Sequence, residues 1–318
     1  MKPLGLLPTD RPYDVVGVGL NAVDTLVVVP EYPAFNSKVE IIDHKRTGGG
    51  QVATALVALQ RWGLQTKYLG AVGDDPEGTF QQESLAREGI DLSDLTVVPG
   101  ASTQMAVIII ESKSGERTIL WRRDPKLARS PDSLHREMIG RGKVLLVDGH
   151  EIGLSMRAAD IAREAGMPVV LDIDSVRPGS EELLSKIDFP VVSETFAPRL
   201  TGKRDLRSAL REVMERSAGD FACATLGSKG AFVLSGEQAL RVHAPQVKAV
   251  DTTGAGDVFH GGFLFGLVSG WGVEKTLRYA TAAAALNCSA YGARGGICER
   301  AQVEKLAVEV RIEPLKDC

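Results

Sequence analysis

Short apolar runs and longer amphipathic stretches alternate along most of this chain. Residues 13–20 form a strand-like run that ends in glycines, whereas residues 51–62 repeat apolar positions with helical spacing. Further strand-like runs occur at residues 67–72, 144–148, 168–172, 189–193 and 222–226. Polar stretches with helical periodicity separate several of them, for example 155–165 and 206–217. This alternation is typical of βαβ units, so it predicts an α/β fold with a largely parallel sheet whose ligands bind beyond the carboxyl ends of the strands.

Two segments break the alternation, because they contain strand patterns with no helix between them. We expect residues 24–46 and 95–121 to pair as a small extra sheet that covers the ligand site as a lid. Residues 107–110 are apolar at both strand parities, so both faces of this strand are expected to be covered. Either a second subunit covers the outer face, which would make a homodimer through the lid, or one subunit buries the strand. With no repeat or linker, residues 1–318 are expected to form a single domain.

The composition restricts the function classes. The chain has 318 residues and a formal net charge of −4, with 37 Lys and Arg against 41 Asp and Glu. That balance leaves no basic excess for a nucleic-acid backbone, so nucleic acid is not an expected partner. There is no run of about 18 apolar residues and no signal-peptide pattern, so we expect a cytoplasmic protein without a membrane segment. The cysteines form no C-x-x-C pair and are expected to be reduced thiols: Cys223, Cys288, Cys298 and Cys318.

The strongest chemical signal is the segment Asp251–Asp257, which reads DTTGAGD. A helical pattern follows it, so Gly254–Gly256 are expected at a helix N-terminus, where small residues leave backbone N–H groups free to face an anion. Asp257 falls in the first helical turn, where its carboxylate can accept a hydroxyl proton while the amides hold a transferring phosphoryl group. The alternative is an Asp helix cap after a glycine turn. The glycines that continue into the helix, such as Gly261 and Gly262, favour the ligand site.

Several motifs in the same order resemble those of the ribokinase-like, or PfkB-type, carbohydrate kinases. The resemblance covers nearly the whole chain. The family's C-terminal signature matches residues 251–263, and its N-terminal glycine motif matches Gly48–Gly50 with the helix pattern at 51–63. Residues 70–78 match the segment after that helix, and residues 225–230 match the nucleotide-binding turn. The resemblance implies a three-layer α/β/α fold with a small β-sheet lid. It also implies a kinase that transfers the γ-phosphate of ATP to a hydroxyl of a small sugar.

The resemblance implies roles for individual residues. The implied catalytic group comprises the base Asp257 and the phosphate-binding backbone of Gly254, Ala255 and Gly256. The residues implied to hold the sugar are Asp24, Gly48, Gly49 and Gly50. Those implied to line the ATP site are Ser193, Thr225, Gly227, Lys229, Gly230 and Thr281. Asp251 and Thr253 match positions that bind a monovalent cation such as K⁺ in relatives. Mg²⁺ would arrive with ATP, held mostly by phosphates and water, with Glu194 as a candidate contact through water.

The sequence leaves the sugar open. Within the family, the segments most similar to the sulfofructose kinase branch are residues 48–55, 192–202, 251–262 and 285–297. This resemblance implies a ketose or an acidic derivative such as a sulfo- or phosphosugar, with Lys38 matching a lysine that meets an anionic group. Trp121 and His150 stand where that branch has Asn and Arg. Arg122 and Arg123 would restore positive charge or lie on a solvated lid surface. His150 follows a strand on the ligand side of the sheet, so it is a candidate sugar contact.

Departures from the family pattern keep other functions open. Ala53 stands where the family has an Asn that contacts sugar, and Phe196 replaces the final carboxylate of the Asn-x-x-Glu motif. A catalytically silent sugar-binding paralogue is therefore an alternative, although the retained Asp257 argues against it. A dinucleotide-binding enzyme is a second alternative, because Gly17–Ala22 fit G-x-G-x-x-A after a strand. Residues 24–29 then have a strand pattern where that motif requires a helix.

Overall fold

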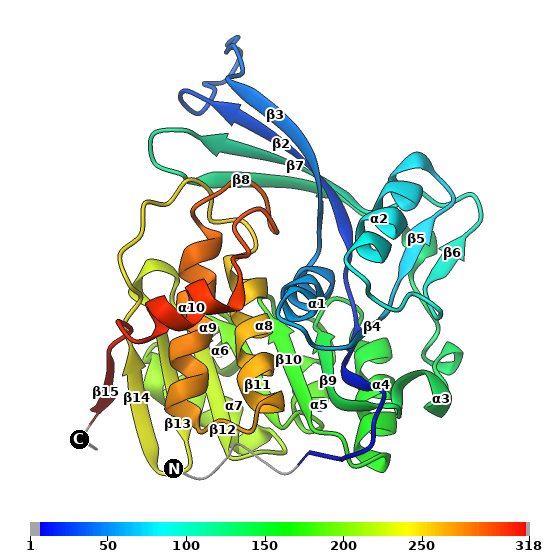
Figure 1. The fold of residues 1–318 in the computed structure, drawn as a ribbon, viewed down its shortest axis with the longest axis vertical. Helices are drawn as coiled ribbons and strands as arrows, with labels where there is room; N and C mark the ends of the chain where they lie inside the picture. Colours follow the sequence, from blue (N-terminus) through cyan, green and yellow to red (C-terminus); the bar gives the residue numbers. More distant parts are fainter. Residues whose placement is uncertain (1–6, 316–318) are drawn as a thin grey trace.

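The computed structural model describes residues 7–315, and a nine-stranded sheet forms its centre (Figure 1). In spatial order the strands are β15 (Ile312–Leu315), β14 (Gln238–Val242), β13 (Ala231–Ser235), β12 (Phe221–Thr225), β11 (Phe189–Ser193), β10 (Val169–Ile173), β9 (Gly142–Asp148), β1 (Tyr13–Val18) and β4 (Thr66–Leu69). Neighbouring strands from β12 to β4 pair in parallel. The pairs from β12 to β15 are antiparallel. The expected largely parallel sheet is therefore confirmed.

Helices cover both faces of this sheet, because alternate strand residues point to opposite sides. Val15 and Val144 belong to one apolar core with the helices α1 (Gln51–Arg61), α8 (Ala255–Val268), α9 (Val273–Asn287) and α10 (Arg300–Ala307). Val16 and Leu145 belong to the other core. Its helices are α3 (Arg136–Ile139), α4 (Ile152–Glu164), α5 (Ser180–Leu184), α6 (Phe196–Thr201) and α7 (Leu206–Arg216). The result is a three-layer α/β/α arrangement.

A separate four-stranded sheet projects beyond the carboxyl ends of the central strands (Figure 1). Its order is β3 (Asp43–Gly49), β2 (Ala22–Val29), β7 (Met105–Glu111) and β8 (Arg117–Arg122). We call it the lid sheet. The two expected lid segments supply these strands, with one difference. Residues 96–98 form β6 (Thr96–Val98), which pairs with β5 (Ala71–Gly73) in a small sheet of its own. The helix α2 (Pro76–Arg87) lies between these two strands in the sequence. The expected strand 67–72 is accordingly divided at Gly70 between two sheets.

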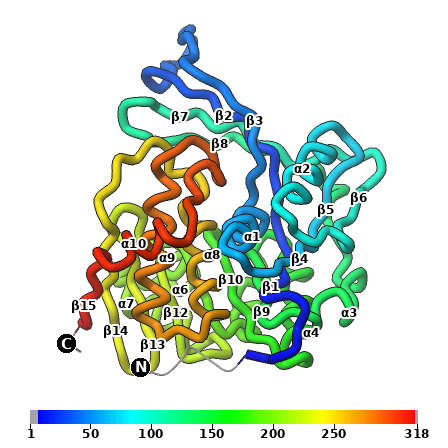
Figure 2. Tube along the Cα trace, in the orientation of Figure 1, coloured from blue at the N-terminus to red at the C-terminus, as the bar shows by residue number. Residues whose placement is uncertain are grey.

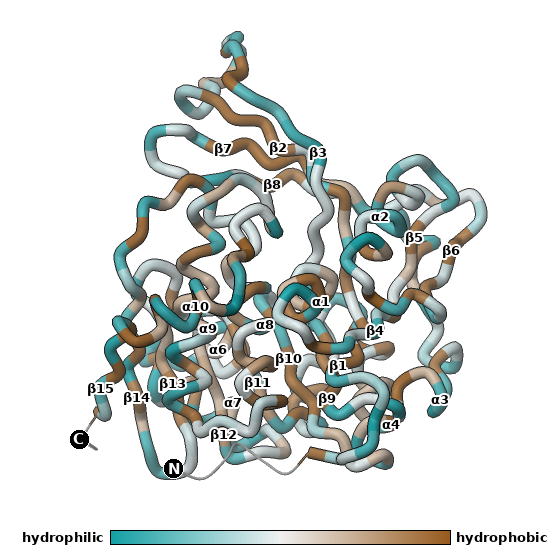
Figure 3. Tube along the Cα trace, viewed as in Figure 1, coloured by the Kyte–Doolittle hydropathy of each residue, from teal (hydrophilic) through white to brown (hydrophobic). Residues whose placement is uncertain are grey.

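Strands β2 and β7 of the lid sheet are largely apolar on both faces, but only one of these faces is covered. Leu26, Ile108 and Ile110 are buried on the face toward the central sheet. Val107 and Ile109, on the outer face, are half-exposed. Figure 3 shows the apolar character running along β2 and β7. Within one chain, the expected coverage of both faces is therefore incomplete.

Two further expectations concern membranes and cysteines. No helix in residues 7–315 is long and apolar enough to cross a bilayer. Cys223 is buried and Cys288 and Cys298 are half-buried, and all three are free thiols. Cys318 lies outside the described residues.

Candidate active site

The DTTGAGD segment forms a tight turn that starts α8, and its geometry depends on Gly254. This residue has a left-handed φ of 75°, and a Cβ atom there would overlap the carbonyl oxygen of Ala293. Only glycine satisfies both conditions. The carboxylate of Asp251 fixes the turn from within. Its Oδ1 accepts hydrogen bonds from the Thr253 amide (2.9 Å) and hydroxyl (2.7 Å), and its Oδ2 accepts one from the Gly292 amide (2.8 Å).

The backbone amides at the start of α8 are available to a ligand. The Ala255 amide donates a 3.3 Å bond to the Thr252 carbonyl. None of residues 7–315 accepts a hydrogen bond from the amides of Gly254, Gly256 or Asp257. Gly256 faces open space, because no atom lies within 4 Å of the place a Cβ would take. Free N–H groups at the positive end of a helix dipole form a site for an anion such as phosphate.

Asp257 lies beside these amides and is half-buried. Burial raises the pKa of its carboxyl to about 8, and the nearby carboxylates of Asp172 and Asp24 act in the same direction. His260 and Arg117 oppose the rise in this pKa. A pKa close to the working pH suits a general base, since the group is then partly ionised and still holds a proton well.

Asp172 connects the two glycine-rich segments of the site. It lies near the carboxyl end of β10, and its Oδ1 accepts a 3.1 Å hydrogen bond from Nε2 of Gln51, the first residue of α1. Its Oδ2 is 3.3 Å from Nδ1 of His260 in α8. Figure 2 shows α1 and α8 side by side although about 200 residues separate them in sequence. Sequence reasoning missed Asp172 and Gln51; an acidic residue ending a buried apolar strand was the available signal.

The predicted sugar-binding residue Asp24 lies on β2, next to the glycine segment 48–50. It is 5% exposed, and no described side chain or amide donates a hydrogen bond to it. Burial raises the pKa of Asp24 to about 6, against the opposing charge of Arg294 and with a smaller contribution from Asp251. Arg294 is itself buried, and its Nη2 donates a 3.0 Å bond to the Gly49 carbonyl. A Cβ at Gly49 would overlap the Asp24 carboxylate, so this backbone passes between the two charges.

Strand β8 contacts the turn at residues 251–256, which we call the phosphate turn, at one end and His150 at the other. We call the region that these two ends and Asp24 border the cleft. Arg117 and Trp121 share one face of this strand, because side chains four residues apart point the same way. At one end the Arg117 guanidinium contacts the Thr252 hydroxyl of the phosphate turn. At the other end the Trp121 ring stands edge-on to His150, with 6.2 Å between the ring centroids. Sequence reasoning did not place Arg117 at the site.

Two of the predicted sugar-binding residues, Arg122 and Lys38, lie away from this cleft. Arg122 follows Trp121 directly, so it points to the outer face of the lid sheet. Arg123 instead forms an ion pair with Glu151. Lys38 lies in the exposed hairpin that connects β2 to β3. Neither Lys38 nor Arg122 supplies charge to the cleft of its own chain.

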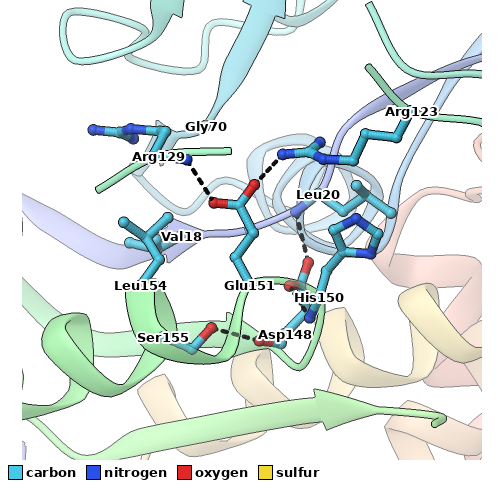
Figure 4. Close-up of a pocket in the computed structure, with 11 residues that line it drawn as sticks. Val18, Leu20, Gly70, Arg123, Arg129, Asp148, His150, Glu151, Leu154 and Ser155 are labelled. Carbon is cyan, nitrogen blue, oxygen red and sulfur yellow. Dashed lines mark hydrogen bonds and ion pairs between the residues drawn. The ribbon is translucent and has the colours of Figure 1, made fainter. Parts of the chain in front are cut away.

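A small pocket lies where β1 and β9 end (Figure 4). In Figure 4, Glu151 lies between Arg123 and Arg129. It pairs with the Arg123 guanidinium and accepts a 3.2 Å bond from the Arg129 amide. Burial, together with the charges of Arg123 and Arg177, lowers the pKa of His150 to about 4. His150 is therefore a neutral imidazole near pH 7 and offers a hydrogen bond or a ring contact.

The acidic residue Asp148 holds the floor of this pocket together. Its Oδ2 accepts a 2.6 Å bond from the Leu20 amide, and its Oδ1 accepts a 3.0 Å bond from the His150 amide. Burial raises the pKa of Asp148 to about 6. Gly17–Ala22 end β1 and enter β2, so no crossover helix follows the G-x-G-x-x-A pattern, as expected for a chain without a dinucleotide site.

The predicted ATP-site residues gather at the carboxyl ends of β11 and β12. Ser193 and Thr225 are register partners there. The short turn η3 (Gly227–Lys229) follows, and Lys229 Nζ lies 3.6 Å from the Glu194 carboxylate. Gly230 has a φ of 88° and packs its backbone against Val242, which gives it a structural role.

Three further positions are a predicted ATP-site residue, Thr281, and the two departures from the family pattern, Ala53 and Phe196. Thr281 is buried in α9, and its Oγ1 has no partner among the described residues. Ala53 and Phe196 are fully buried and offer no polar group. Among residues 7–315 no group of three or more His, Cys, Asp and Glu is arranged to hold a metal ion.

The sequence of this chain is similar to those of known carbohydrate kinases. Residues 14–299 match the family described as pfkB family carbohydrate kinase. The ribokinase of Haemophilus influenzae is 30% identical over 291 residues, covering 87% of this chain and 92% of that protein. The 5-dehydro-2-deoxygluconokinase of Halalkalibacterium halodurans is 27% identical over 323 residues, covering 94% and 96%.

Solved structures agree with these sequence matches. A protein of Agrobacterium tumefaciens superposes with a TM-score of 0.87 at 32% identity, covering 93% of this chain and 98% of the other. The ribokinase of Arabidopsis thaliana, complexed with ribose and ATP, superposes with a TM-score of 0.79 at 27% identity and the same coverage. The more specific resemblance to sulfofructose kinase is not confirmed by these comparisons.

Proposed function

This chain belongs to the pfkB family of carbohydrate kinases, and on that premise we propose that it transfers the γ-phosphate of ATP to a hydroxyl of a small sugar. It has the ribokinase-like α/β fold and is a phosphotransferase with an alcohol group as acceptor. One observation carries the proposal. The unpaired amides of Gly254, Gly256 and Asp257 lie next to a carboxyl group whose pKa is about 8.

The proposed transfer needs only positioning, charge stabilisation and one proton acceptor. The sugar hydroxyl gives its proton to the Asp257 carboxylate as its oxygen forms a bond to the γ-phosphorus. The bond between that phosphorus and the bridging oxygen of ADP breaks, and ADP leaves with the electron pair. The amides of Gly254 and Gly256 hydrogen-bond the equatorial oxygens of the transferring group.

The nucleotide is proposed to lie over the ends of β11 and β12. Ser193, Thr225 and the η3 turn gather there, and the relative from Arabidopsis thaliana was solved with ATP. The exposed carboxylates near this end, Asp174 and Glu194, suit an Mg²⁺ ion that phosphates and water hold for the most part. Bound Mg²⁺ would neutralise charge on the β- and γ-phosphates. Monovalent-cation binding by Asp251 and Thr253 stays a prediction, and both Asp251 oxygens already accept hydrogen bonds.

The sugar is proposed to lie between Asp24, the glycine segment 48–50 and the ring of Trp121. The carboxylate of Asp24 has no partner within the described protein and is free to accept bonds from sugar hydroxyls. The charge states of the residues around His150 favour a neutral, hydroxyl-rich sugar over an acidic one. His150 is neutral near pH 7, and Arg123 is already paired with Glu151.

A screen of ADP release tests the proposed function. The full chain is mixed with ATP, Mg²⁺ and, one at a time, neutral pentoses, hexoses and ketoses, and carboxylated, sulfonated and phosphorylated sugars. We expect ADP release that depends on the sugar and is fastest with a neutral one. If no sugar raises ADP release above the rate with ATP alone, the kinase proposal fails. Calorimetric binding of a sugar without turnover would instead establish the silent sugar-binding alternative.

A further inference from the structure

The imidazole of His260 is held in an unusual way. His260 lies in the first turns of α8 and is 3% exposed. Its Nδ1 is 2.8 Å from the carbonyl oxygen of Gly256, and its Nε2 is 3.1 Å from the carbonyl oxygen of Val191 in β11. Both ring nitrogens therefore face oxygens that only accept hydrogen bonds.

A neutral imidazole does not fit this environment well. It has one N–H donor and one lone pair, so one of its nitrogens would direct a lone pair at a carbonyl oxygen. The protonated ring has two N–H groups and satisfies both carbonyls. A buried polar group without its hydrogen bond is costly, so the pairing favours the cation.

Carboxylates surround this ring. Asp172 Oδ2 lies 3.3 Å from Nδ1, and Asp257 is close enough to act on the same ring. Burial lowers the pKa of His260 below its ordinary value, and the two carbonyl oxygens and the Asp257 carboxylate offset only part of that shift. The observation that favours a charged ring against this shift is the pair of short contacts from its nitrogens to the two carbonyl oxygens. Around Asp172 the other groups are Asp148, Asp174 and Gln51.

We propose that His260 is a positioning residue that carries both ring protons and places a positive charge near both Asp172 and Asp257. Two carboxylates in one buried site tend to share a proton, because like charges cannot both be ionised at low cost. A cation beside them favours the ionised form of Asp257. Asp257 then faces the sugar hydroxyl with its proton-accepting oxygens free. His260 itself takes no proton from the substrate, since both of its nitrogens already carry one.

The same bonds have a mechanical effect. The Gly256 carbonyl that His260 binds belongs to the peptide unit whose N–H is that of Asp257. Holding this carbonyl fixes the direction of the neighbouring free amide. Val191 anchors the ring to the central sheet, so the phosphate turn is oriented by a rigid element.

Nuclear magnetic resonance of the full chain, labelled with ¹⁵N in its histidines, tests the charge directly. The chain has five histidines, and the spectrum of His260→Gln identifies the resonances of His260 by their loss. We expect both ring nitrogens of His260 to have the shifts of an imidazolium at pH 7.5. Asp172→Asn should lower the pH at which the second ring proton is lost. A neutral tautomer at pH 7.5 in the unaltered protein overturns the proposal.

Kinetics give a second, independent readout. Without the cation, Asp257 should be harder to ionise, so the acid limb of kcat against pH should move up by about one unit or more in His260→Gln. A purely structural loss would lower kcat at every pH without moving the limb. His135→Gln is the matched control, because His135 is exposed at the start of α3, on the opposite face of the central sheet from α8. Its profile should equal that of the unaltered enzyme.

This inference rests on the proposed role of Asp257, and the two can fail separately. The charge of His260 is measured without substrate or turnover. If Asp257→Asn keeps its activity while His260 is an imidazolium, the assignment of the base is wrong and the buried cation stands. If His260 is neutral while Asp257→Asn is inactive, the base stands and the present proposal is wrong.

Discussion

At the scale of single residues, carboxyl groups with raised pKa values gather where the central strands end. Asp148 and Asp172 end or nearly end buried strands, and Asp257 and Asp24 approach them from α8 and the lid sheet. Burial is the main cause of the raised pKa in each of the four. The site therefore keeps acidic groups partly protonated near neutral pH, which suits proton transfer from an alcohol.

The pH dependence of catalysis should report Asp257. Its carboxyl accepts a proton only when ionised, and its raised pKa of about 8 means that the ionised fraction grows as the pH rises toward 8. We expect kcat/KM for the sugar to rise nearly tenfold per unit between pH 6 and 7 and to level off above about 8.5. Initial rates of ADP release across this range provide the measurement. A flat profile from pH 6 to 8.5 would contradict the assigned base.

Sequence alone identified some of these residues and not others, for a physical reason. Asp257 and Gly254–Gly256 are local: the helix start and its acidic first turn can be deduced from neighbouring residues. Arg294 and Arg117 are not local. Their contacts, to the Gly49 carbonyl and to the Thr252 hydroxyl, join segments more than a hundred residues apart. No periodicity or spacing in the sequence encodes such a pair.

At the scale of elements, two glycines at the start of α8 have different roles. Gly254 is required by the backbone of the turn, whereas Gly256 leaves space at the phosphate site. Gly254→Ala should destabilise the protein, because an L side chain is strained at a φ of 75° and the Cβ overlaps the Ala293 carbonyl. We expect a loss of about 1–3 kcal/mol in unfolding free energy. Gly256→Ala is the matched control, because its Cβ meets open space.

The two variants should have opposite effects on the stability of the protein. Gly256→Ala should keep or slightly raise the melting temperature, since alanine is favoured over glycine in a helix by about 0.5–1 kcal/mol. It should still lower kcat, because the added methyl group enters the phosphate site. Calorimetry and ADP-release assays on both proteins measure this. Equal stability of the two variants would show that the turn does not need its glycine.

Strand β8 offers a second matched pair. Trp121 faces His150 across the cleft, whereas Arg122 points to the outer face. We expect Trp121→Ala to raise the KM for sugar about tenfold or more, because the ring supplies apolar contact to a bound sugar. Arg122→Ala should change the KM less than about twofold. The reverse order would return Arg122 to the sugar site and remove Trp121 from it.

The element boundaries show where pattern reading works. Buried strands such as β11 and β12 follow from short apolar runs, because both of their faces are covered. The run at 67–72 was expected as one strand and is two, since the chain changes sheets at Gly70. An apolar run records burial and does not record which sheet buries it.

At the scale of the whole molecule, the lid sheet has an apolar outer face that this chain leaves half-exposed. Val107 and Leu120 are register partners on that face, and Val27 lies two strands away from Leu120. Leu120 is 56% exposed. An apolar face of this kind fits a second copy of the chain, so the predicted homodimer through the lid stays our proposal.

Light scattering after size exclusion should show a dimer at micromolar concentration. Leu120→Glu should shift it toward monomer, because the change puts a charge in the proposed interface. Lys305→Glu provides a control, since α10 packs against α9 in the body of the molecule, below the lid sheet (Figure 1). A monomeric unaltered protein would contradict the proposed dimer.

The central claim is that the Asp257 carboxylate accepts the sugar proton while free amides at the start of α8 hold the migrating phosphoryl group. The measurement that tests it most directly is kcat of Asp257→Asn at saturating ATP and sugar, with ATP affinity measured alongside by calorimetry. The account expects kcat to fall at least about a hundredfold with ATP affinity nearly unchanged, because only the proton acceptor is lost. An Asn variant that keeps most of its turnover would contradict it.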